Sequence, residues 1–428
     1  MLAVLERAAA WMARVKESHP GNQSAAALLA FHNSCSLLGS RWGRSRDRFL
    51  ERILSGRTRE GWTSEYGGPD PGYESLTLDS LTRCFDRGLR GVRDAIRSGL
   101  EFLDASVLPD GSSPSSLSWR GTNFIVPYAI ERWAEEEPAA RRVARRIRLA
   151  AFEGRIPTPS TADRRYTAHF FLPSYVDAHF RCSDAVVEPG EDVPKSSHRE
   201  QGGVRVFSGD AFRVHLQERR GGIAVFSNTL HRTIWIGHTY CLRSRREIFI
   251  PYWDGSFLHA AGDAVEGSAT FRSLPGGSRH ARLVSSCLAG GRLFGAGGWI
   301  ETRIKSYAFG PGAPGPARLR RRIDILPGTI RILDSLDASR AARGTELYTV
   351  PGGGPSNHPS SQMFSELELS LPPILSGDTA AAISDAWRTG GTVNVDLGFE
   401  TSGQEISYRC LVGNRETSRG KIVARTVR

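Results

Sequence analysis

One short stretch of this chain, residues 61–73, gathers the side-chain types that catalytic and binding sites use. Its two carboxylates, two tyrosines and one tryptophan lie among four glycines and two prolines. Glycine allows close backbone approach and proline stiffens the chain, so such a loop can be ordered. Ordered polar loops carry sites more often than loops that merely connect elements. The alternative is a structural loop that leads into the next helix, with Tyr73 as a packing residue.

The same region supplies candidates for sugar chemistry. The carboxylates Glu65, Asp70 and Asp79 could serve an inverting glycoside hydrolase, which needs two carboxyl groups across a sugar ring. Indole rings stack on sugars, and Trp62 and Trp119 fall in expected loops rather than inside helices. Core packing is the alternative role for both tryptophans, and for this residue type it is the commoner one.

Composition places the chain among globular proteins with room for two or three domains. It has 428 residues, of which 39% are hydrophobic and 24% charged. No apolar run approaches the length of a membrane-crossing helix. The N-terminus lacks the basic and apolar regions of a secretion signal. We therefore expect no membrane span and a cytoplasmic location, or a periplasmic one if the natural chain begins upstream of Met1.

The net charge of +11 comes almost entirely from arginine, since only Lys16, Lys195, Lys305 and Lys421 are lysines. A basic chain can bind nucleic acid. Here the arginines are spread along the whole sequence and do not alternate with aromatic residues, so we expect a bias towards arginine and no nucleic-acid partner. An anionic substrate remains compatible, because the arginine fork holds carboxylates and sulfates in a bidentate manner.

The sequence offers no signature of a metal or a cofactor. The six cysteines lie far apart, without a Cys-x-x-Cys pair, so we expect neither a zinc site nor a disulfide scaffold. There is no phosphate-binding loop and no dinucleotide fingerprint. A Gly-x-Ser-x-Gly nucleophile elbow is also missing. We expect no cofactor.

The spacing of apolar residues divides the chain into two domains. Residues 1–156 show helical spacing broken at glycine and proline, which predicts a stack of helical hairpins. Residues 185–428 carry short apolar runs between turns, which is typical of a large antiparallel β-sandwich. We expect residues 157–184 to form an ordered linker between the two domains.

Individual elements follow from the same patterns. Asn22 is expected to be the N-cap of the second helix. A tight turn at Leu326–Thr329 predicts a β-hairpin. Helices are expected over residues 2–15, 25–39, 45–54, 73–87, 92–107, 123–133 and 139–152. Strands are expected over residues 204–207, 212–216, 222–226, 233–236, 247–250, 322–326 and 329–333.

Three stretches carry a resemblance to a known family. They are residues 62–81, residues 107–123 with a Pro-Asp-Gly-Ser segment and an Arg-Gly-Thr-Asn segment, and residues 321–336. Together they resemble the heparinase II/III-like polysaccharide lyases, and most closely a bacterial branch with a Glu-Tyr-Gly-Gly-x-Asp-Pro-Gly-Tyr loop. The resemblance implies an (α/α) toroid of helical hairpins followed by a β-sandwich. With about seven expected helices, the toroid would be incomplete.

The chemistry implied by this resemblance is β-elimination of a uronic-acid polysaccharide. An amide or cation neutralises the sugar carboxylate, and a tyrosine removes the adjacent proton and protonates the leaving oxygen. Carried over to matching positions, Asn22 is the expected carboxylate neutraliser and Tyr73 the expected acid and base. Glu65 and Tyr66 would lie beside them in the site.

Further substrate contacts are implied for Arg120 and Asn123, which stand in the second matching stretch. The family's β domain usually supplies a His-Gly-His-x-Asp segment, and this sequence has none. The nearest candidates are His231 and His238, and a lone strand histidine is more often structural than catalytic. A second hypothesis is therefore a non-catalytic protein that binds an acidic glycan or assists exopolysaccharide assembly.

Overall fold

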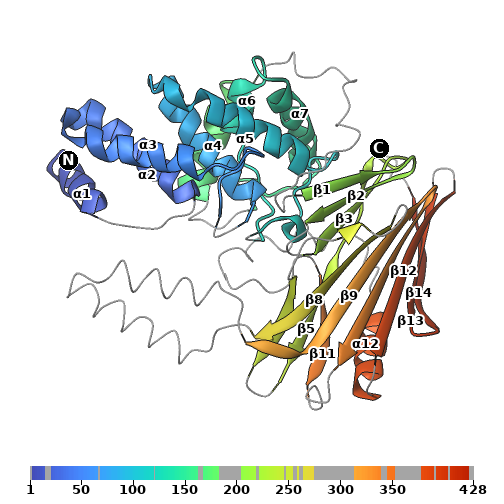
Figure 1. Cartoon of the computed structure of the whole chain (residues 1–428). Coiled ribbons are helices and arrows are strands. Elements are labelled where there is room, and N and C mark those ends of the chain that lie inside the picture. Colours follow the sequence, from blue (N-terminus) through green and yellow to red (C-terminus); the bar gives the residue numbers. More distant parts are fainter. Residues whose placement is uncertain are drawn as a thin grey trace. The chain divides into compact units, whose positions relative to one another are not determined.

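The structure, a computed structural model, divides into two compact units (Figure 1). The helical unit contains the described residues up to 107 and from 122 to 182, and the β unit contains residues 108–121 and the described residues from 204 onward. The structure describes residues 2–14, 21–65, 68–119, 121–161, 167–182, 204–217, 221–244, 247–253, 258–259, 264–273, 313–338, 345–351, 377–389, 392–402 and 405–423.

The helical unit confirms the predicted run of helices. Helix α2 packs against both α3 and α4, α4 packs against α5, and α5 packs against α7, so contacts join helices that are consecutive in the chain and helices that are one apart. Their apolar faces meet in one core that includes Leu28, Leu81 and Leu100. The α-helices are α1 (Leu2–Arg14), α2 (Gly21–Leu38), α3 (Gly43–Gly56), α4 (Pro71–Asp86), α5 (Arg93–Ser106), α6 (Tyr128–Trp133), α7 (Pro138–Phe152) and α9 (Leu172–His179). Short 3-10 helices occur at Ser40–Trp42 and Arg90–Val92, and a π-helical turn at Thr167–Phe171.

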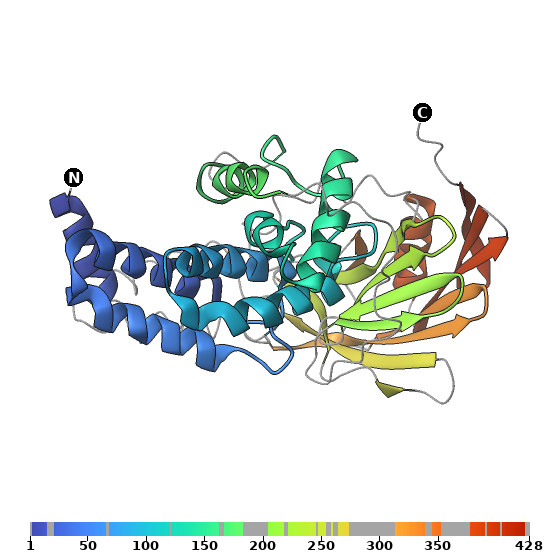
Figure 2. The ribbon, with the colours of Figure 1, turned by 90° about the horizontal axis from the view of Figure 1, so that it is seen from above.

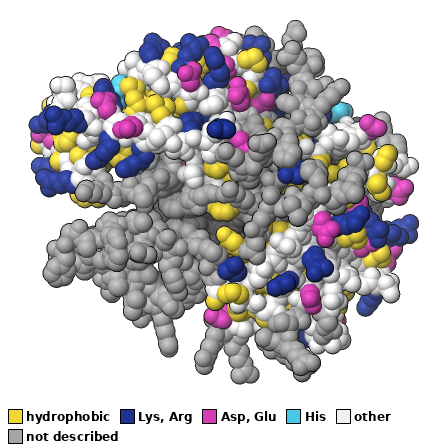
Figure 3. Space-filling model, in the orientation of Figure 1, with side chains coloured by type: hydrophobic (Ala, Val, Ile, Leu, Met, Phe, Trp, Pro, Cys, Tyr) yellow, Lys and Arg dark blue, Asp and Glu magenta, His cyan; other side chains and the backbone are white. Residues whose placement is uncertain are grey.

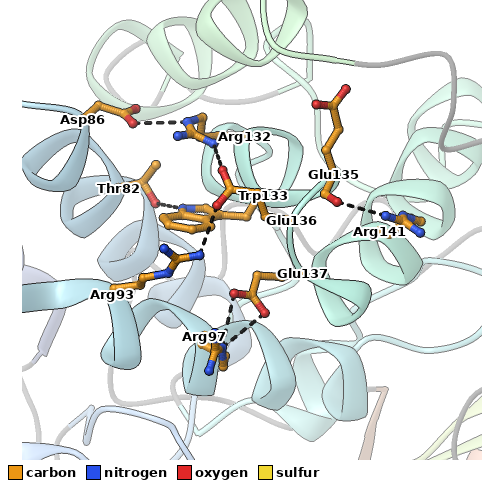
Figure 4. A network of polar contacts seen from close by, with 10 residues as sticks. All are labelled: Thr82, Asp86, Arg93, Arg97, Arg132, Trp133, Glu135, Glu136, Glu137 and Arg141. Carbon is orange, nitrogen blue, oxygen red and sulfur yellow. Dashed lines mark hydrogen bonds and ion pairs between the residues drawn. The ribbon is translucent and has the colours of Figure 1, made fainter. Parts of the chain in front are cut away.

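Polar contacts fasten the end of α6 to its neighbours (Figure 4). Arg132 lies 3.1 Å from Asp86 of α4 and 2.8 Å from Glu136. Ion pairs as accessible as these contribute at most about 1 kcal/mol each. Trp133 is 1% exposed, and its indole nitrogen donates to the hydroxyl of Thr82 over 3.1 Å. The buried indole therefore contributes more to this junction than the surface ion pairs do.

The helix predicted over residues 123–133 is wrong in its first half, because α6 begins only at Tyr128. The preceding residues 121–127 form neither helix nor strand and contact the start of α4. There the hydroxyl of Thr122 donates to Asp70, and the backbone N–H of Val126 donates to Ser75 over 3.1 Å. These contacts replace the intrahelical hydrogen bonds that residues 123–127 would otherwise make.

Helix α9 lies inside the stretch that was expected to link the domains. Its Ser174 accepts a hydrogen bond from the backbone of Tyr128 over 3.0 Å and donates one to Asp79 over 2.9 Å. Arg83 also contacts Asp79, at 2.7 Å. Burial raises the pKa of the Asp79 carboxyl, although Arg83 opposes the rise. The described part of the expected linker is thus integrated into the helical unit.

The β unit consists of two antiparallel sheets, and the strands predicted from the sequence are all present. The small sheet has the order β1-β2-β3-β4, and the large sheet has the order β11-β5-β6-β8-β9-β10-β12-β13-β14, with β7 paired to β8. The small-sheet strands are β1 (Val204–Ser208), β2 (Phe212–Gln217), β3 (Gly222–Ser227) and β4 (Arg232–Ile236). The large-sheet strands are β5 (His238–Arg243), β6 (Ile248–Trp253), β7 (Leu258–His259), β8 (Ala264–Ser273), β9 (Pro314–Leu326), β10 (Thr329–Ala338), β11 (Glu346–Pro351), β12 (Thr392–Ser402), β13 (Glu405–Val412) and β14 (Arg415–Val423).

The two sheets share one hydrophobic core. The large sheet curls, and the small sheet lies on its concave side (Figure 2). The ring of Trp235 from the small sheet lies 5.9 Å from that of Phe399 in the large sheet. Helix α12 (Gly377–Thr389), which the sequence patterns did not predict, adds Trp387 to the same core. The predicted hairpin is confirmed by the pairing of Leu326 with Thr329 between β9 and β10.

Residues 108–121 follow α5 in the chain and yet fold with the small sheet. Asp110 accepts a hydrogen bond from the backbone N–H of Thr233 over 2.7 Å. The hydroxyl of Ser116 donates to the backbone carbonyl of Ile223 over 3.3 Å. A small apolar cluster forms beneath the loop, comprising Leu108, Leu117, Val204 and Ala224. The Pro-Asp-Gly-Ser segment therefore fastens a loop to the β unit.

Both ends of this excursion are fixed in the helical unit. The backbone carbonyl of Val107 accepts a hydrogen bond from Arg146 of α7 over 2.8 Å. Arg146 also pairs with Asp104, and its side chain is 8% exposed. At the return point Thr122 is bonded to Asp70. The chain thus leaves and re-enters the helical unit at two anchored positions.

The close approach of this loop to β3 can be tested at Gly222. A Cβ atom there would lie 1.7 Å from the carbonyl oxygen of Ser116. We expect Gly222→Ala to lower the free energy of unfolding by about 1–3 kcal/mol through overpacking. Gly398 of β12 has no neighbour within 4 Å of the same point, so Gly398→Ala should be neutral or slightly stabilising. Chemical denaturation followed by circular dichroism compares them, and equal midpoints would contradict the packing.

Candidate functional site

A buried ion pair holds the beginning of the 61–73 loop. Arg57 is the C-cap residue that follows α3, and its guanidinium lies 3.1 Å from the carboxylate of Glu74 in α4. Both side chains are buried, at 7% and 1% exposure. The other carboxylate oxygen of Glu74 accepts a hydrogen bond from the backbone N–H of Thr63 over 2.9 Å. Arg57 also donates to the carbonyl of Gly61 and, over 3.2 Å, to the hydroxyl of Ser98 in α5.

The middle of the loop closes over the start of α2. Glu65 is 1% exposed, and it accepts a hydrogen bond from the backbone N–H of Asn22 over 2.8 Å. The backbone carbonyl of Ser64 accepts a further bond from the N–H of Gly21 over 3.3 Å. A carboxylate at this position satisfies an N–H that the helix leaves unpaired and complements the positive end of the helix dipole.

Asn22 is not the N-cap that the sequence predicted. Helix α2 begins at Gly21, so Asn22 lies in its first turn, and its backbone is bonded to Glu65. Its side-chain oxygen is buried and has no hydrogen-bond partner among the residues that the structure describes. A buried amide oxygen without a partner is costly, and native proteins rarely keep one without a reason.

Asp70 performs a structural task at the end of the loop. It is the N-cap of α4, where its carboxylate accepts from the backbone N–H of Tyr73 over 2.9 Å and from the hydroxyl of Thr122. Pro71 follows at the first helical position, which favours helix initiation. A Cβ atom at Gly72 would lie 2.4 Å from the Thr122 hydroxyl, so only glycine fits there.

Tyr73 lies in the first turn of α4 and keeps part of its side chain exposed. Its ring meets the ring of Phe124 edge to face, with 6.1 Å between centroids and 82° between planes. Asn123, which precedes Phe124, is 5% exposed. Two segments with about fifty residues between them, the loop and residues 122–124, therefore meet at one helix N-terminus.

The two predicted tryptophans lie in different surroundings. Trp62 is 4% exposed, its ring packs 6.5 Å from that of Phe102, and its nitrogen donates to Glu60 over 2.8 Å. The Trp62 ring is thus part of the helical core, and its burial prevents it from stacking on a sugar ring. Trp119 is half-buried and belongs to the β unit.

Other predicted site residues are less informative. Tyr66 and Arg120 lie outside the described residues. His231 is exposed in the turn between β3 and β4, with a φ of 48°. His238 begins β5, and its side chain is outside the described set. The sequence analysis named Asn22, Glu65, Asp70, Tyr73 and Asn123 as site residues. All five belong to the helical unit.

The sequence analysis missed three residues that build this site. Glu74 and Arg57 form the buried pair, and Thr122 bonds the helix cap. Glu74 stands directly after Tyr73, so its position offered a weak signal. For Arg57 there was none, because one arginine among 52 carries no mark of burial. The sequence analysis also missed the helix start at Asp70 and Pro71, although both residue types favour those positions.

The ion pair gives a test with a pH signature. We expect Arg57→Met to cost about 3 kcal/mol at neutral pH, because it leaves Glu74 buried without its cation. Burial raises the pKa of Glu74 above its ordinary 4.5, and Arg57 opposes that rise, so the pKa climbs further in the variant. A raised carboxyl pKa gives stability that is present below 4.5 and lost as the pH rises through the folded value. The penalty should therefore grow with pH.

The penalty is measured by comparing the denaturation midpoints of wild type and Arg57→Met from below pH 4.5 up to neutral pH. Arg41→Met is the matched control, since Arg41 pairs with Glu6 on the surface and its side chain is 54% exposed. We expect that control to change stability little at any pH. A penalty at Arg57 that stays constant with pH would contradict the role assigned to the pair.

The described residues show neither a membrane-crossing helix nor a metal-binding cluster. None of their helices combines the length and the apolar composition that a bilayer crossing requires. Nowhere in the described ranges do three histidine, cysteine, aspartate or glutamate side chains gather as metal ligands would. Neither a scan against models of known protein families nor a search of curated proteins returned a match to this chain.

Proposed function

We propose that this chain acts on an acidic, uronic-acid-containing polysaccharide and cleaves it by β-elimination. The observation that carries the proposal is that Glu65 bonds to the start of α2 at Asn22, that Tyr73 contacts Phe124, the neighbour of Asn123, at the start of α4, and that α2 packs against α4. This gathers an amide pair, a partly exposed tyrosine and a buried carboxylate in one unit. It also joins the loop of residues 61–73 with the segment around Asn123, and these two stretches carry the lyase-like resemblance.

In this proposal Tyr73 moves the protons. As a phenolate it takes the C5 proton of a uronate, the released electron pair forms the C4–C5 double bond, and the bond from C4 to the glycosidic oxygen breaks. The leaving oxygen then receives the proton from the Tyr73 hydroxyl. Partial exposure of Tyr73 supports the role, because the phenol must reach a substrate, and the edge contact with Phe124 fixes the direction of the ring.

Asn22 is assigned to the uronate carboxyl group. Its side-chain oxygen, which has no partner among the described residues, lies in the first turn of α2, where helix N–H groups and the dipole favour an anion. Amide oxygen and nitrogen are exchanged by a half-turn of the side chain, so this position can present the N–H donors that neutralise a carboxylate. Asn123 is assigned to the substrate's hydroxyl groups.

The wider architecture supports the same proposal. We infer that the helical unit is an incomplete (α/α) toroid and that the β unit is a β-sandwich with one curled sheet. Consecutive helix pairs that pack together, such as α2 with α3 and α4 with α5, and two antiparallel sheets with a common core are compatible with that plan. The predominance of arginine among the basic residues suits an anionic polymer.

Two alternatives differ in what they require. An inverting hydrolase needs free carboxylates, and the caps that Asp70 and Glu65 provide weigh against both residues in that role. A non-catalytic glycan-binding protein requires no proton transfer at Tyr73. The absence of a His-Gly-His-x-Asp segment from the sequence favours this second alternative over the first.

The lyase assignment is tested with Tyr73→Phe. We expect wild type to release unsaturated product, seen as ultraviolet absorbance, from at least one polymer in a panel of uronic-acid polysaccharides. The variant should lose at least about a hundredfold in rate, as general acid–base catalysts usually contribute that much. Tyr348→Phe is the control, since Tyr348 is an exposed tyrosine of β11 and should keep full activity. Equal rates for wild type and Tyr73→Phe would disprove the role.

Asp70→Asn separates elimination from hydrolysis. Asparagine is as good an N-cap as aspartate, so the variant should fold and keep its unsaturated product. Measuring reducing ends together with absorbance shows which bond-breaking route operates. If wild type produced reducing ends without unsaturated product, and Asp70→Asn produced no reducing ends, the hydrolase hypothesis would replace the lyase hypothesis.

A further inference from the structure

The outer face of β9 carries three exposed arginines, one at every second position of the strand. Arg318, Arg320 and Arg322 alternate with the buried residues of the strand, so all three point away from the core. Side chains at every second position of a strand are about 6.8 Å apart. In Figure 3, dark blue side chains lie over the part of the large sheet formed by β8 and β9. The face is therefore a candidate surface for an anion.

Two of these three arginines have no side-chain partner among the residues that the structure describes. Arg322 is neutralised by Asp324, which accepts its hydrogen bond over 2.7 Å. Neither Arg318 nor Arg320 makes a side-chain hydrogen bond or an ion pair with anything in the part of the chain that the structure describes. Asp337 stands opposite Arg318 in the strand register without forming such a pair. The field of two guanidinium groups is thus left for an external anion.

The neighbours of Arg320 are neutral hydrogen-bonding groups. Ser268 of β8 and Ser335 of β10 flank it directly, and Asn394 of β12 comes next in the same row. Adjacent strands are about 4.8 Å apart, so the row forms a level band of hydroxyl and amide groups on both sides of one cation. Such a band can donate to and accept from sugar hydroxyls while the arginine holds an acid group.

A second row places an aromatic residue beside Arg318. Thr270 of β8 stands opposite Arg318, and Tyr252 of β6 stands opposite Thr270. The Tyr252 side chain is 37% exposed, and the guanidinium of Arg272 lies 5.2 Å from its ring centroid. An exposed ring beside cations offers a hydrophobic face for a sugar.

We propose that the outer face of β8, β9 and β10, centred on Arg318 and Arg320, is a second binding surface for an extended anionic polysaccharide. The inference takes its ligand class from the proposed function, and the surface would anchor a polymer away from the reacting bond. Hydroxyl and amide neighbours favour a polysaccharide over a nucleic acid, because they match sugar hydroxyls, while among the described residues of these rows Tyr252 alone offers a ring for base stacking.

The test compares the full chain with Arg318→Gln/Arg320→Gln, using polygalacturonate, heparin, neutral dextran and single-stranded DNA as probes. We expect wild type to bind polygalacturonate or heparin, dextran to stay unbound, and the double variant to bind about tenfold more weakly. Its salt dependence should also be shallower. Arg388→Gln is the matched control, because Arg388 is an exposed arginine of α12 paired only on the surface.

Each outcome decides the matter. Equal affinity of wild type and the double variant, or no binding of either acidic polysaccharide, overturns the surface. Tighter binding of DNA than of both polysaccharides overturns the assigned ligand class. Tyr73→Phe should keep polymer binding, and the double variant should keep its rate on a short oligosaccharide. Loss of the surface and failure of the lyase assignment are thereby distinguishable.

Discussion

The arrangement of the candidate site depends on one buried ion pair. Arg57 and Glu74 lie where water cannot screen them, so each is costly without the other. Because the pair joins the end of α3 to the first turn of α4, it fixes the span of the loop between them. The hydrogen bond from Thr63 to Glu74 then sets the path by which the chain reaches Glu65. The position of Tyr73 follows from that path and from the cap beside it.

That constraint also separates side chains that hold the site together from side chains to which the proposal gives a chemical role. Asp70 is engaged in a helix cap, whereas Asn22 keeps a side-chain amide without a partner in the described structure, and Tyr73 keeps part of its ring exposed. A protein retains unsatisfied buried groups mainly where a ligand or a strained function makes use of them. The proposal therefore assigns the reaction to the Asn22 amide and the Tyr73 phenol rather than to the carboxylates.

Local chemistry made much of this structure predictable. The turn between Leu326 and Thr329 acts through its own backbone preferences and was found where expected, and the helix expected from residue 73 begins two residues earlier at Pro71. The Arg57–Glu74 pair was not predictable, since nothing near Arg57 in the sequence announces its partner. The same holds for residues 123–127, whose helical pattern is overridden by contacts with α4. Long-range pairing decides such cases, and a single sequence does not display it.

The excursion of residues 108–121 has a consequence for how this chain can be divided. Residues 108–121 belong to the β unit, yet in the chain they come before α6, α7 and α9 of the helical unit. A gene fragment that starts at the sheets would lack the apolar floor contributed by Leu108 and Leu117. A fragment that stops before the sheets would carry this loop without the strands it bonds to. The β unit is therefore not encoded by one continuous stretch of the chain, and cutting between helices and sheets would damage it.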